Sequence, residues 1–313
     1  MGKIDSKNGI IGLVVGDAMG VPLEFCKREI LMKNPIKEMK GFGSHNVPKG
    51  SWSDDSSMTI ATIDAIIKDK GISYGTIADN FVDWIELAKY TPSGKVFGVG
   101  RTCLKAISKY ESKKVEAQMC GGISEKDNGN GSMMRILPLA YYCYSRNMNE
   151  EKIYELVKDV SSITHGHEIS IMGCFIYVMY AIKLLNNENL KQTYEEIKQI
   201  RYNEYFSKNT INRYKKILEN NIKESSLDEI NSTGFVVDTL EATLWILLNT
   251  NSYNQAIIGA INLGNDTDTI GACVGGLAGI YYGFDNINPA WKKELIKYNY
   301  LVDMCDKFNE VLN

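Results

Sequence analysis

Two clusters of hydroxyl and carboxylate side chains offer the groups that could do chemistry. The first reads Ser-Asp-Asp at positions 53–55, and the second reads Asp-Thr-Asp-Thr at positions 266–269. Each cluster stands just before an apolar segment with helical spacing. Ser and Asp at a helix start usually act as surface N-caps, because they satisfy free backbone N–H groups and interact well with the helix dipole. One cluster alone favours that interpretation, whereas two clusters of the same kind indicate a shared function.

Oxygen is the donor atom that both clusters offer to a metal. Side chains two positions apart point away from each other in a regular helix, so Asp266 and Asp268 converge best if the backbone is irregular at the helix entrance. Carboxylates without imidazole or thiolate ligands select Mg²⁺, Mn²⁺ or Ca²⁺, and four carboxylates at one point need compensating cations. We therefore predict a site for two divalent cations. Glu24 could reach the same place, although an isolated Glu near a proline is more often simply exposed.

The histidine and cysteine content excludes several other metal sites. With three histidines in the chain, at positions 45, 165 and 167, a three-imidazole site and an HExxH protease are excluded. The seven cysteines are odd in number, form no CxxC pair and mostly lie in apolar helical segments. Neither a disulfide framework nor a zinc site is therefore expected.

Net charge and apolar segments limit the partners. The 35 basic and 38 acidic residues leave a formal charge of -3, which provides no general field for nucleic acid or an anionic membrane. The chain start lacks the apolar core of a signal peptide, and the apolar segments are interrupted by Asp17 or shorter than the about 20 residues that cross a bilayer. We expect a monomeric, cytoplasmic protein with no membrane partner and no general nucleic-acid binding.

Helical periodicity extends over most of the chain and must position these groups. Ile153, Val157 and Val160 share one helix face, with charged residues between them. Similar patterns predict helices over residues 56–69, 76–90, 101–110, 132–145, 167–185, 235–250, 253–263, 269–282 and 290–312, and convincing period-2 strands are absent. The predicted fold is all-α, with one domain over residues 1–313. We expect the polar residues 186–233 to form a variable rim of short helices.

Glycine recurs at every fourth position in two apolar segments. The positions are Gly12, Gly16 and Gly20 in the first segment and Gly271, Gly275 and Gly279 in the second. Such spacing permits close approach between two helix backbones. In a membrane it would indicate a dimer seam, but the acids within and beside these segments favour a tightly packed interior.

Six segments, in order along the chain, resemble the ADP-ribosylglycohydrolases, a family that includes bacterial dinitrogenase reductase-activating glycohydrolases and ADP-ribosylarginine hydrolases. They are GDAMGVPLE (16–24), SWSDDSSM (51–58), DNGNGSMMR (127–135), ITHGHE (163–168), GFVVDTLEA (234–242) and LGNDTDTIGACVGGLAGIYYG (263–283). An ordered set of this kind is far more specific than any single motif.

The resemblance implies an orthogonal bundle of many helices with a binuclear Mg²⁺ or Mn²⁺ centre at the base of an ADP-ribose cleft. Carried over by position, the metal ligands are Ser53, Asp54, Asp55, Asp266, Asp268 and Thr269. Glu24 matches an acid beside the metals and is expected both as a ligand and as a catalytic group. Ser53 stands where many relatives have Thr, and Asn265 where they have Gly or Asp, but neither change removes a metal-capable oxygen.

The resemblance also implies the residues that contact ADP-ribose. The glycine-rich loop that wraps the distal ribose and diphosphate supplies Asn130, Gly131, Ser132 and Met133. His165 matches a family histidine that contacts the ligand, whereas His167 has no counterpart. Phe235 matches an aromatic residue near the ligand, though core packing is an equal alternative, and Gly100 is a softer candidate for the cleft lining.

The predicted function is hydrolysis of the glycosidic bond between ADP-ribose and an acceptor, with the arginine side chain of a modified protein or a small conjugate as partner. Asp127 favours arginine, because it matches an acid that acts on the substrate in arginine-specific relatives and a carboxylate can pair with a guanidinium. The predicted catalytic residues are Asp127, Glu24 and Asp55. In this hypothesis the two ions hold the ribose hydroxyls and a water, while Asp127 or Glu24 handles the proton.

Several alternatives remain open from the sequence. The acceptor could be an O-linked serine, a nucleic-acid base or a small molecule, and the chain could bind ADP-ribose without hydrolysing it. An unrelated two-metal phosphohydrolase would share the carboxylate chemistry but leave the glycine-rich loop unexplained.

Overall fold

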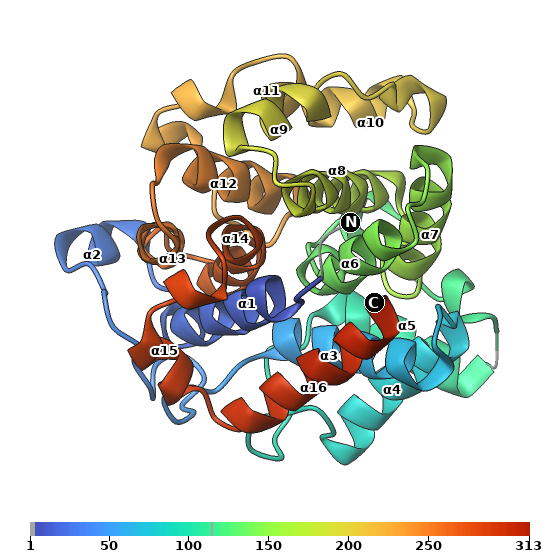
Figure 1. Cartoon of the computed structure of the whole chain (residues 1–313), viewed down its shortest axis with the longest axis horizontal. Coiled ribbons are helices and arrows are strands. Elements are labelled where there is room, and N and C mark those ends of the chain that lie inside the picture. Colours follow the sequence, from blue (N-terminus) through green and yellow to red (C-terminus); the bar gives the residue numbers. More distant parts are fainter. Residues whose placement is uncertain (1–3, 114) are drawn as a thin grey trace.

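Helices make up the regular structure of this protein, as a computed structural model describes it over residues 4–113 and 115–313. The α-helices are α1 (Lys7–Gly20), α2 (Arg28–Lys33), α3 (Asp54–Asp69), α4 (Tyr74–Leu87), α5 (Arg101–Lys113), α6 (Leu137–Ser145), α7 (Glu150–Ser162), α8 (Glu168–Leu185), α9 (Leu190–Ile197), α10 (Lys208–Arg213), α11 (Lys215–Leu218), α12 (Val236–Asn249), α13 (Tyr253–Ile261), α14 (Thr267–Tyr282), α15 (Pro289–Glu294) and α16 (Tyr298–Leu312) (Figure 1). Short 3₁₀ turns are η1 (Val21–Leu23), η2 (Ala117–Met119), η3 (Glu125–Asp127), η4 (Met133–Arg135), η5 (Tyr202–Glu204), η6 (Ile222–Glu224), η7 (Leu227–Glu229) and η8 (Phe284–Asn286). Pairing between extended segments is limited, within these ranges, to the isolated bridges Gly122–His165 and Gly129–Phe235. The all-α prediction is confirmed.

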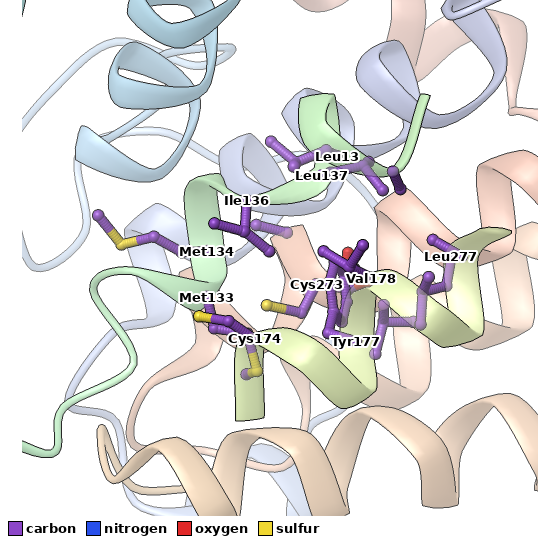
Figure 2. Packing of buried hydrophobic residues seen from close by; sticks show 14 of the residues in the cluster. Leu13, Met133, Met134, Ile136, Leu137, Cys174, Tyr177, Val178, Cys273 and Leu277 are labelled. Atoms are coloured by element: carbon purple, nitrogen blue, oxygen red, sulfur yellow. The ribbon is translucent and has the colours of Figure 1, made fainter. Parts of the chain in front are cut away.

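The core forms where helices from both ends of the chain meet those from its middle. α1 packs along α14, α8 packs against α6, α7, α12 and α14, and α3 packs against α4 and α16. Figure 2 shows side chains of η4, α6, α8 and α14 interdigitating, among them Met133, Leu137, Tyr177 and Cys273. The Tyr177 hydroxyl donates to the Cys273 carbonyl oxygen at 3.0 Å, which satisfies a polar group inside this apolar cluster.

At the contact between α1 and α14 the facing residues include glycines, which have no side chains to separate the two backbones. A Cβ added at Gly16 would lie 1.9 Å from the Gly271 carbonyl oxygen, and one added at Gly20 would lie 2.4 Å from the Cα of Asp268. The Thr267 hydroxyl also donates to the Gly20 carbonyl oxygen at 2.8 Å. The predicted close approach of the two glycine-rich segments is confirmed, and it places the end of α1 directly beside the start of α14.

Two predicted helices differ in their bounds. The predicted helix 132–145 begins only at Leu137, because Pro138 stands in the first turn of α6 and the preceding residues form the 3₁₀ turn η4. The predicted helix 290–312 is broken between α15 and α16. There Lys297 takes a left-handed φ of 54°, and the N–H of Ile296 donates to the Gly50 carbonyl oxygen instead of a carbonyl of its own helix.

α8 is the one helix in the described ranges that is long and apolar enough to cross a membrane. Its 18 residues carry a mean hydropathy of 1.6, but 78% of them are buried inside the fold. α8 lies between α6, α7, α9 and α12 (Figure 1), so its apolar character is explained by its place in the core.

Residues 186–233 fold against the rest of the chain through tyrosines. The Tyr194 hydroxyl donates to the Ile217 carbonyl oxygen, and the Tyr214 hydroxyl donates to the Ile169 carbonyl oxygen of α8, both at 2.7 Å. α9, α10 and α11 lie along one side of the molecule (Figure 1). Short helices are therefore present as predicted, and the variability of this rim stays a prediction.

The two ends of the described chain are joined. The N–H of Ile4 donates to the Asn313 side-chain oxygen at 3.0 Å, and the Asn313 amide donates back to the Ile4 carbonyl oxygen at 3.1 Å. The N–H of Ser6 donates to the Asn309 side-chain oxygen at 2.8 Å. These bonds hold the start of α1 against the end of α16.

The glycine contact predicts a large stability effect for a small change. A Gly16→Ala substitution places a methyl group against backbone that cannot move aside, and we expect a loss of about 3 kcal/mol or more in the free energy of unfolding. Gly75→Ala in α4 is the matched control, since its Cβ would meet only the Tyr110 hydroxyl at 3.8 Å and alanine favours a helix. Denaturant unfolding of both variants measures the difference, and equal stability would contradict the described contact.

Candidate metal and ligand site

A cavity of about 500 Å³ opens where the motif segments meet. Its acidic wall comprises Glu24, Asp54, Asp266 and Asp268, together with Thr269. The remaining lining comes from residues 98 and 100–103, from residues 126, 129–131 and 134, from His165 and from residues 233–234, with Phe25 and Asn265 at its edge. Segments that are far apart in the sequence therefore meet around one volume, as predicted.

Asp17 of α1 anchors the acidic start of α3. Its carboxylate accepts the Ser53 N–H at 3.0 Å, the Ser56 N–H at 3.1 Å and the Ser56 hydroxyl at 2.5 Å. Asp17 is completely buried on a helix whose neighbouring residues are apolar. It thus satisfies free N–H groups at the N-terminus of α3 and fixes the direction in which the next two aspartates point.

The Ser53 side chain caps α3 in addition. Its hydroxyl accepts the Asp55 N–H at 3.2 Å, so the N-cap interpretation of this residue is correct. Its own N–H is taken by Asp17, and its side chain is buried. Ser53 is therefore both the N-cap of α3 and a part of the acidic cluster, and this cap lies inside the molecule.

The carboxylates of Asp17, Asp55 and Asp268 can each offer an oxygen such that the three atoms lie within 4.8 Å of one another. Asp55 is 1% exposed, and its Oδ2 atom has no hydrogen-bond partner among the described residues. Its Oδ1 atom accepts the Thr269 hydroxyl at 3.3 Å. A buried carboxylate oxygen without a partner, surrounded by other carboxylates, fits a hard divalent cation and fits no protein donor present here.

An irregular backbone leads into α14, as predicted for the second acidic cluster. Gly264 and Asn265 have φ values of 77° and 59°, and Asp266 stands at the N-cap with φ −91° and ψ 67°. The Asp266 carboxylate accepts the Asn130 amide N–H at 2.5 Å, and the same amide donates to the Thr239 hydroxyl at 2.9 Å. This contact ties the glycine-rich loop to the acidic wall.

Burial and mutual repulsion raise the pKa values of these acids. Desolvation raises the pKa of Asp17 to about 6, against the hydrogen bonds from Ser56 and Ser53 that lower it. Desolvation, with the charges of Asp17 and Glu24, raises the pKa of Asp54 to about 8. The pKa values of Asp55 and Asp268 are raised well above the ordinary range for the same reasons. The cluster favours protons or metal cations over bare negative charge.

Glu24 reaches the acidic wall, as the sequence suggested, and His45 contacts it there. The His45 Nε2 atom is in direct contact with the Glu24 carboxylate, and ligand atoms of Glu24, His45 and Asp268 lie within 4.8 Å of one another. The hydrogen bond to Glu24 raises the pKa of His45. The imidazole ring also packs on Phe97, with ring centroids 5.0 Å apart.

His165 lines the cavity beside the glycine-rich loop. It is 2% exposed, and burial together with the positive charge of Arg135 lowers its pKa to about 3. A Cβ at Gly131 would lie 2.9 Å from the His165 Cε1 atom, so only glycine fits beside the ring at this distance. Asn130 and Gly131 also line the cavity, and their contact with ADP-ribose stays a prediction.

A helix start and two cations face the same volume. Gly100 precedes α5 and accepts the Leu104 N–H at 3.0 Å, so Gly100, Arg101 and Thr102 line the cavity with the first turn of α5. The first turn of a helix presents unpaired N–H groups and a partial positive charge. Arg101 and Lys126 are exposed at the lining, so this side of the cavity is suited to an anion.

Asp127 does not line the cavity. Its Oδ2 atom accepts the N–H and the hydroxyl of Ser124, at 3.1 and 2.7 Å, and these bonds lower the pKa of Asp127. The positive charge of Lys105 lowers its pKa further. Its other oxygen, Oδ1, takes part in no hydrogen bond within the described ranges. Its catalytic role stays a prediction.

Three other predicted ligand residues are placed beside the cavity rather than in its lining. The Ser132 hydroxyl contacts Ser161 at 2.9 Å inside the core, and the Met133 side chain is fully buried there (Figure 2). Phe235 is half-buried against the core, and its backbone pairs with Gly129. The Phe235 ring packs against the core, which was the alternative to a place at the ligand. The substrate roles of Ser132, Met133 and Phe235 stay predictions.

Sequence reasoning missed two residues of the site. Asp17 was recognised as an acid in an apolar helix but not as part of the cluster, although a lone acid on an otherwise apolar helix needs a buried partner. His45 was given no role, because the predicted metal site had oxygen ligands alone. Nothing in the local sequence of His45 indicates that the loop folds back onto Glu24.

Comparisons with known proteins agree with this geometry. A family model described as ADP-ribosylglycohydrolase matches residues 6–313. The chain is 30% identical over 291 residues to the ADP-ribosylarginine hydrolase Tri1 of Pseudomonas putida (strain GB-1), covering 93% of this chain and 74% of that protein. It is 28% identical over 287 residues to the ADP-ribosyl-[dinitrogen reductase] glycohydrolase of Rhodospirillum rubrum, covering 91% and 88%.

A solved structure described as an ADP-ribosylglycohydrolase-related protein complex shares the fold. The TM-score is 0.82 at 23% sequence identity, and the match covers 99% of this chain and 98% of the other. At that identity the likeness concerns the fold, which is the family bundle predicted from the motifs.

The raised acid pKa values predict how the metal-free protein responds to pH. A carboxyl whose pKa is raised by folding binds more protons in the folded state than in the unfolded state. The free energy of unfolding therefore decreases as the pH rises from 3.8, the pKa of an unfolded aspartate, through the folded-state pKa values of about 6 for Asp17 and about 8 for Asp54. In a chelator, we expect the melting temperature to fall between about pH 5 and about pH 8, and Mg²⁺ or Mn²⁺ to restore it. Calorimetry checks this, with Asp54→Asn expected to flatten the pH dependence. A melting temperature that rises over this range in chelator would contradict the prediction.

Proposed function

The chain belongs to the ADP-ribosylglycohydrolase family, and we propose that it hydrolyses the bond between ADP-ribose and the arginine side chain of a modified protein, with two Mg²⁺ or Mn²⁺ ions at the acidic wall. The observation that carries the proposal is one cavity with two chemically different sides. Buried acids line one side, and a helix start with exposed cations lines the other. A sugar diol linked to a diphosphate has the complementary groups.

The residues that would hold the ions are Ser53, Asp54, Asp55, Asp266, Asp268 and Thr269, with Glu24 and Asp17 beside them. The unpartnered Asp55 oxygen and the all-oxygen donor set support this assignment. A pair of divalent cations bound there would lower the pKa of a water, so that it is a nucleophile at neutral pH, and would help to orient the sugar hydroxyls.

The protein's own residues would bind and orient the rest of the ligand. The first turn of α5 and Arg101 attract the diphosphate, and the backbone at Gly129 and Gly131 leaves room for it to approach closely. Asn130 holds this loop against Asp266, so the loop and the acidic wall keep a fixed separation. Glu24 at the acidic wall and the buried Asp55 are the acids that could move a proton.

Arginine is the proposed acceptor for two reasons. Relatives at 30% and 28% identity are named ADP-ribosylarginine hydrolase. The Oδ1 atom of Asp127 has no hydrogen-bond partner among the described residues, so it could accept a guanidinium N–H. Because Asp127 does not line the cavity, another ADP-ribose conjugate, such as a serine-linked or nucleotide-linked one, is the second candidate.

Substitutions of the buried Asp55 and of Asp268 in the acidic wall test the proposed hydrolytic centre. We expect Asp55→Asn and Asp268→Asn to reduce turnover of ADP-ribosyl-arginine by at least about 100-fold, because each removes charge from the proposed metal site. Asp69→Asn changes the same residue type at the exposed end of α3 and should keep wild-type turnover. Metal content by mass spectrometry accompanies the rates. Full turnover in Asp55→Asn with metal still bound would contradict the assignment.

A substrate panel tests the acceptor. ADP-ribosylated arginine, serine and nucleotide substrates are compared in Mg²⁺ and in Mn²⁺, and we expect arginine to give the highest kcat/KM. Asp127→Asn should lower kcat/KM for the arginine substrate by about tenfold or more, the value of a charge-assisted hydrogen bond. Ser124→Ala, which leaves the carboxylate in place, is the control. A preference for serine, unchanged by Asp127→Asn, would favour the second candidate.

A further inference from the structure

Arg135 is a buried cation that has no carboxylate partner among the described residues. It is 0% exposed, its Nη2 atom donates to the Val160 carbonyl oxygen at 3.1 Å, and its guanidinium lies 4.8 Å from the centre of the Phe81 ring. Its Nε and Nη1 atoms have no hydrogen-bond partner among the described residues. Burying an unpaired charge is costly, so this position calls for a role beyond packing.

The same Nη2 atom donates to the Thr164 hydroxyl oxygen at 2.8 Å, and this contact limits where the hydroxyl hydrogen can point. The Nδ1 atom of His165 lies 3.0 Å from the Thr164 oxygen and is a strong acceptor when unprotonated. The Cys103 sulfur is the competing acceptor near Thr164, but sulfur accepts weakly, and its own S–H points to the Gly131 carbonyl oxygen at 3.7 Å. The hydroxyl therefore donates to Nδ1.

We propose that Arg135 and Thr164 are positioning residues that hold His165 in its Nε2–H tautomer, so that it presents a fixed N–H donor to an oxygen of ADP-ribose. The benefit for ligand binding rests on the proposed function, whereas the choice of tautomer is a property of the free protein. Arg135 donates to Thr164, Thr164 donates to Nδ1, and the ring proton is left on the nitrogen that faces the ligand loop.

The surroundings of the ring support this assignment. Burial lowers the pKa of Arg135 to about 10, so the guanidinium keeps its charge at neutral pH. Burial and that charge lower the pKa of His165 to about 3, so the ring is neutral and has a tautomer to choose. A proton on Nδ1 would point toward Thr164, to which Arg135 donates, so the positive guanidinium would oppose the positive end of that N–H dipole.

The other ring nitrogen faces the cavity. The Nε2 atom lies 3.5 Å from the positions that a Cβ would occupy at Gly129 and at Gly131, and it has no hydrogen-bond partner among the described residues. Since His165 lines the cavity, Nε2–H is free to donate to a phosphate or hydroxyl oxygen of the ligand. The two glycines leave the space through which that oxygen would approach.

The experiment compares Thr164→Val with Thr164→Ser. Valine keeps the shape of threonine without its hydroxyl, and serine keeps the hydroxyl. ¹⁵N NMR of histidine-labelled protein reports the protonated nitrogen, with His165 assigned from a His165→Asn variant. We expect an Nε2–H ring in the wild type and in Thr164→Ser, and a shifted Nδ1 resonance with mixed tautomers in Thr164→Val.

Calorimetry with ADP-ribose gives the second readout. Thr164→Val should bind ADP-ribose about tenfold more weakly than Thr164→Ser, which is the value of one hydrogen bond. Arg135→Met, which fills the site without charge, should release the hydroxyl and admit the Nδ1–H form while the protein still unfolds cooperatively. Should Arg135→Met fail to fold, the threonine pair decides the question.

Two results would overturn the proposal. One is a wild-type His165 protonated on Nδ1, and the other is a Thr164→Val protein with wild-type ¹⁵N shifts and wild-type affinity. A wild-type protein that has the Nε2–H ring but binds no ADP-ribose would instead refute the proposed function and leave the tautomer assignment standing.

Discussion

The contact between α1 and α14 is the constraint on which the site depends. Two helices with ordinary side chains between them pack 8–10 Å apart, whereas glycines at Gly16, Gly20 and Gly271 bring these backbones into direct contact. Asp17 lies on one helix of this pair and Asp268 on the other. Their carboxylates can approach each other only because no side chain separates the two backbones.

The acidic start of α3 completes the site through hydrogen bonds. Asp17 accepts N–H groups from both ends of the first turn of α3, so the same carboxylate that faces Asp268 also sets the direction of Asp54 and Asp55. Burying these like charges together raises their pKa values and destabilises the ionised cluster. A divalent cation bound there would offset that repulsion, and its binding would then stabilise the fold.

Much of the fold and part of the site could be predicted from the sequence. Helices with long apolar faces were found, because their periodicity is local. The break at Lys297 was missed, because it depends on a bond from Ile296 to Gly50, which lies far away in the chain. Asp54, Asp266 and Asp268 were recognised because their motifs are local in the sequence. The contact between His45 and Glu24 was missed, because it depends on how a loop folds back and leaves no pattern in the sequence.

The glycine contact also has a consequence for how the chain is made. The Thr267 hydroxyl donates to a carbonyl oxygen 247 residues earlier, so α1 emerges from the ribosome long before its partner exists. Twelve of its 14 residues are buried in the finished protein, and until α14 is synthesised this apolar helix lacks its most extensive packing partner. Early exposure of such a surface invites chaperone binding or aggregation, and folding dominated by distant contacts is slow. The arrangement that builds the cavity therefore delays its completion until α14 has been synthesised.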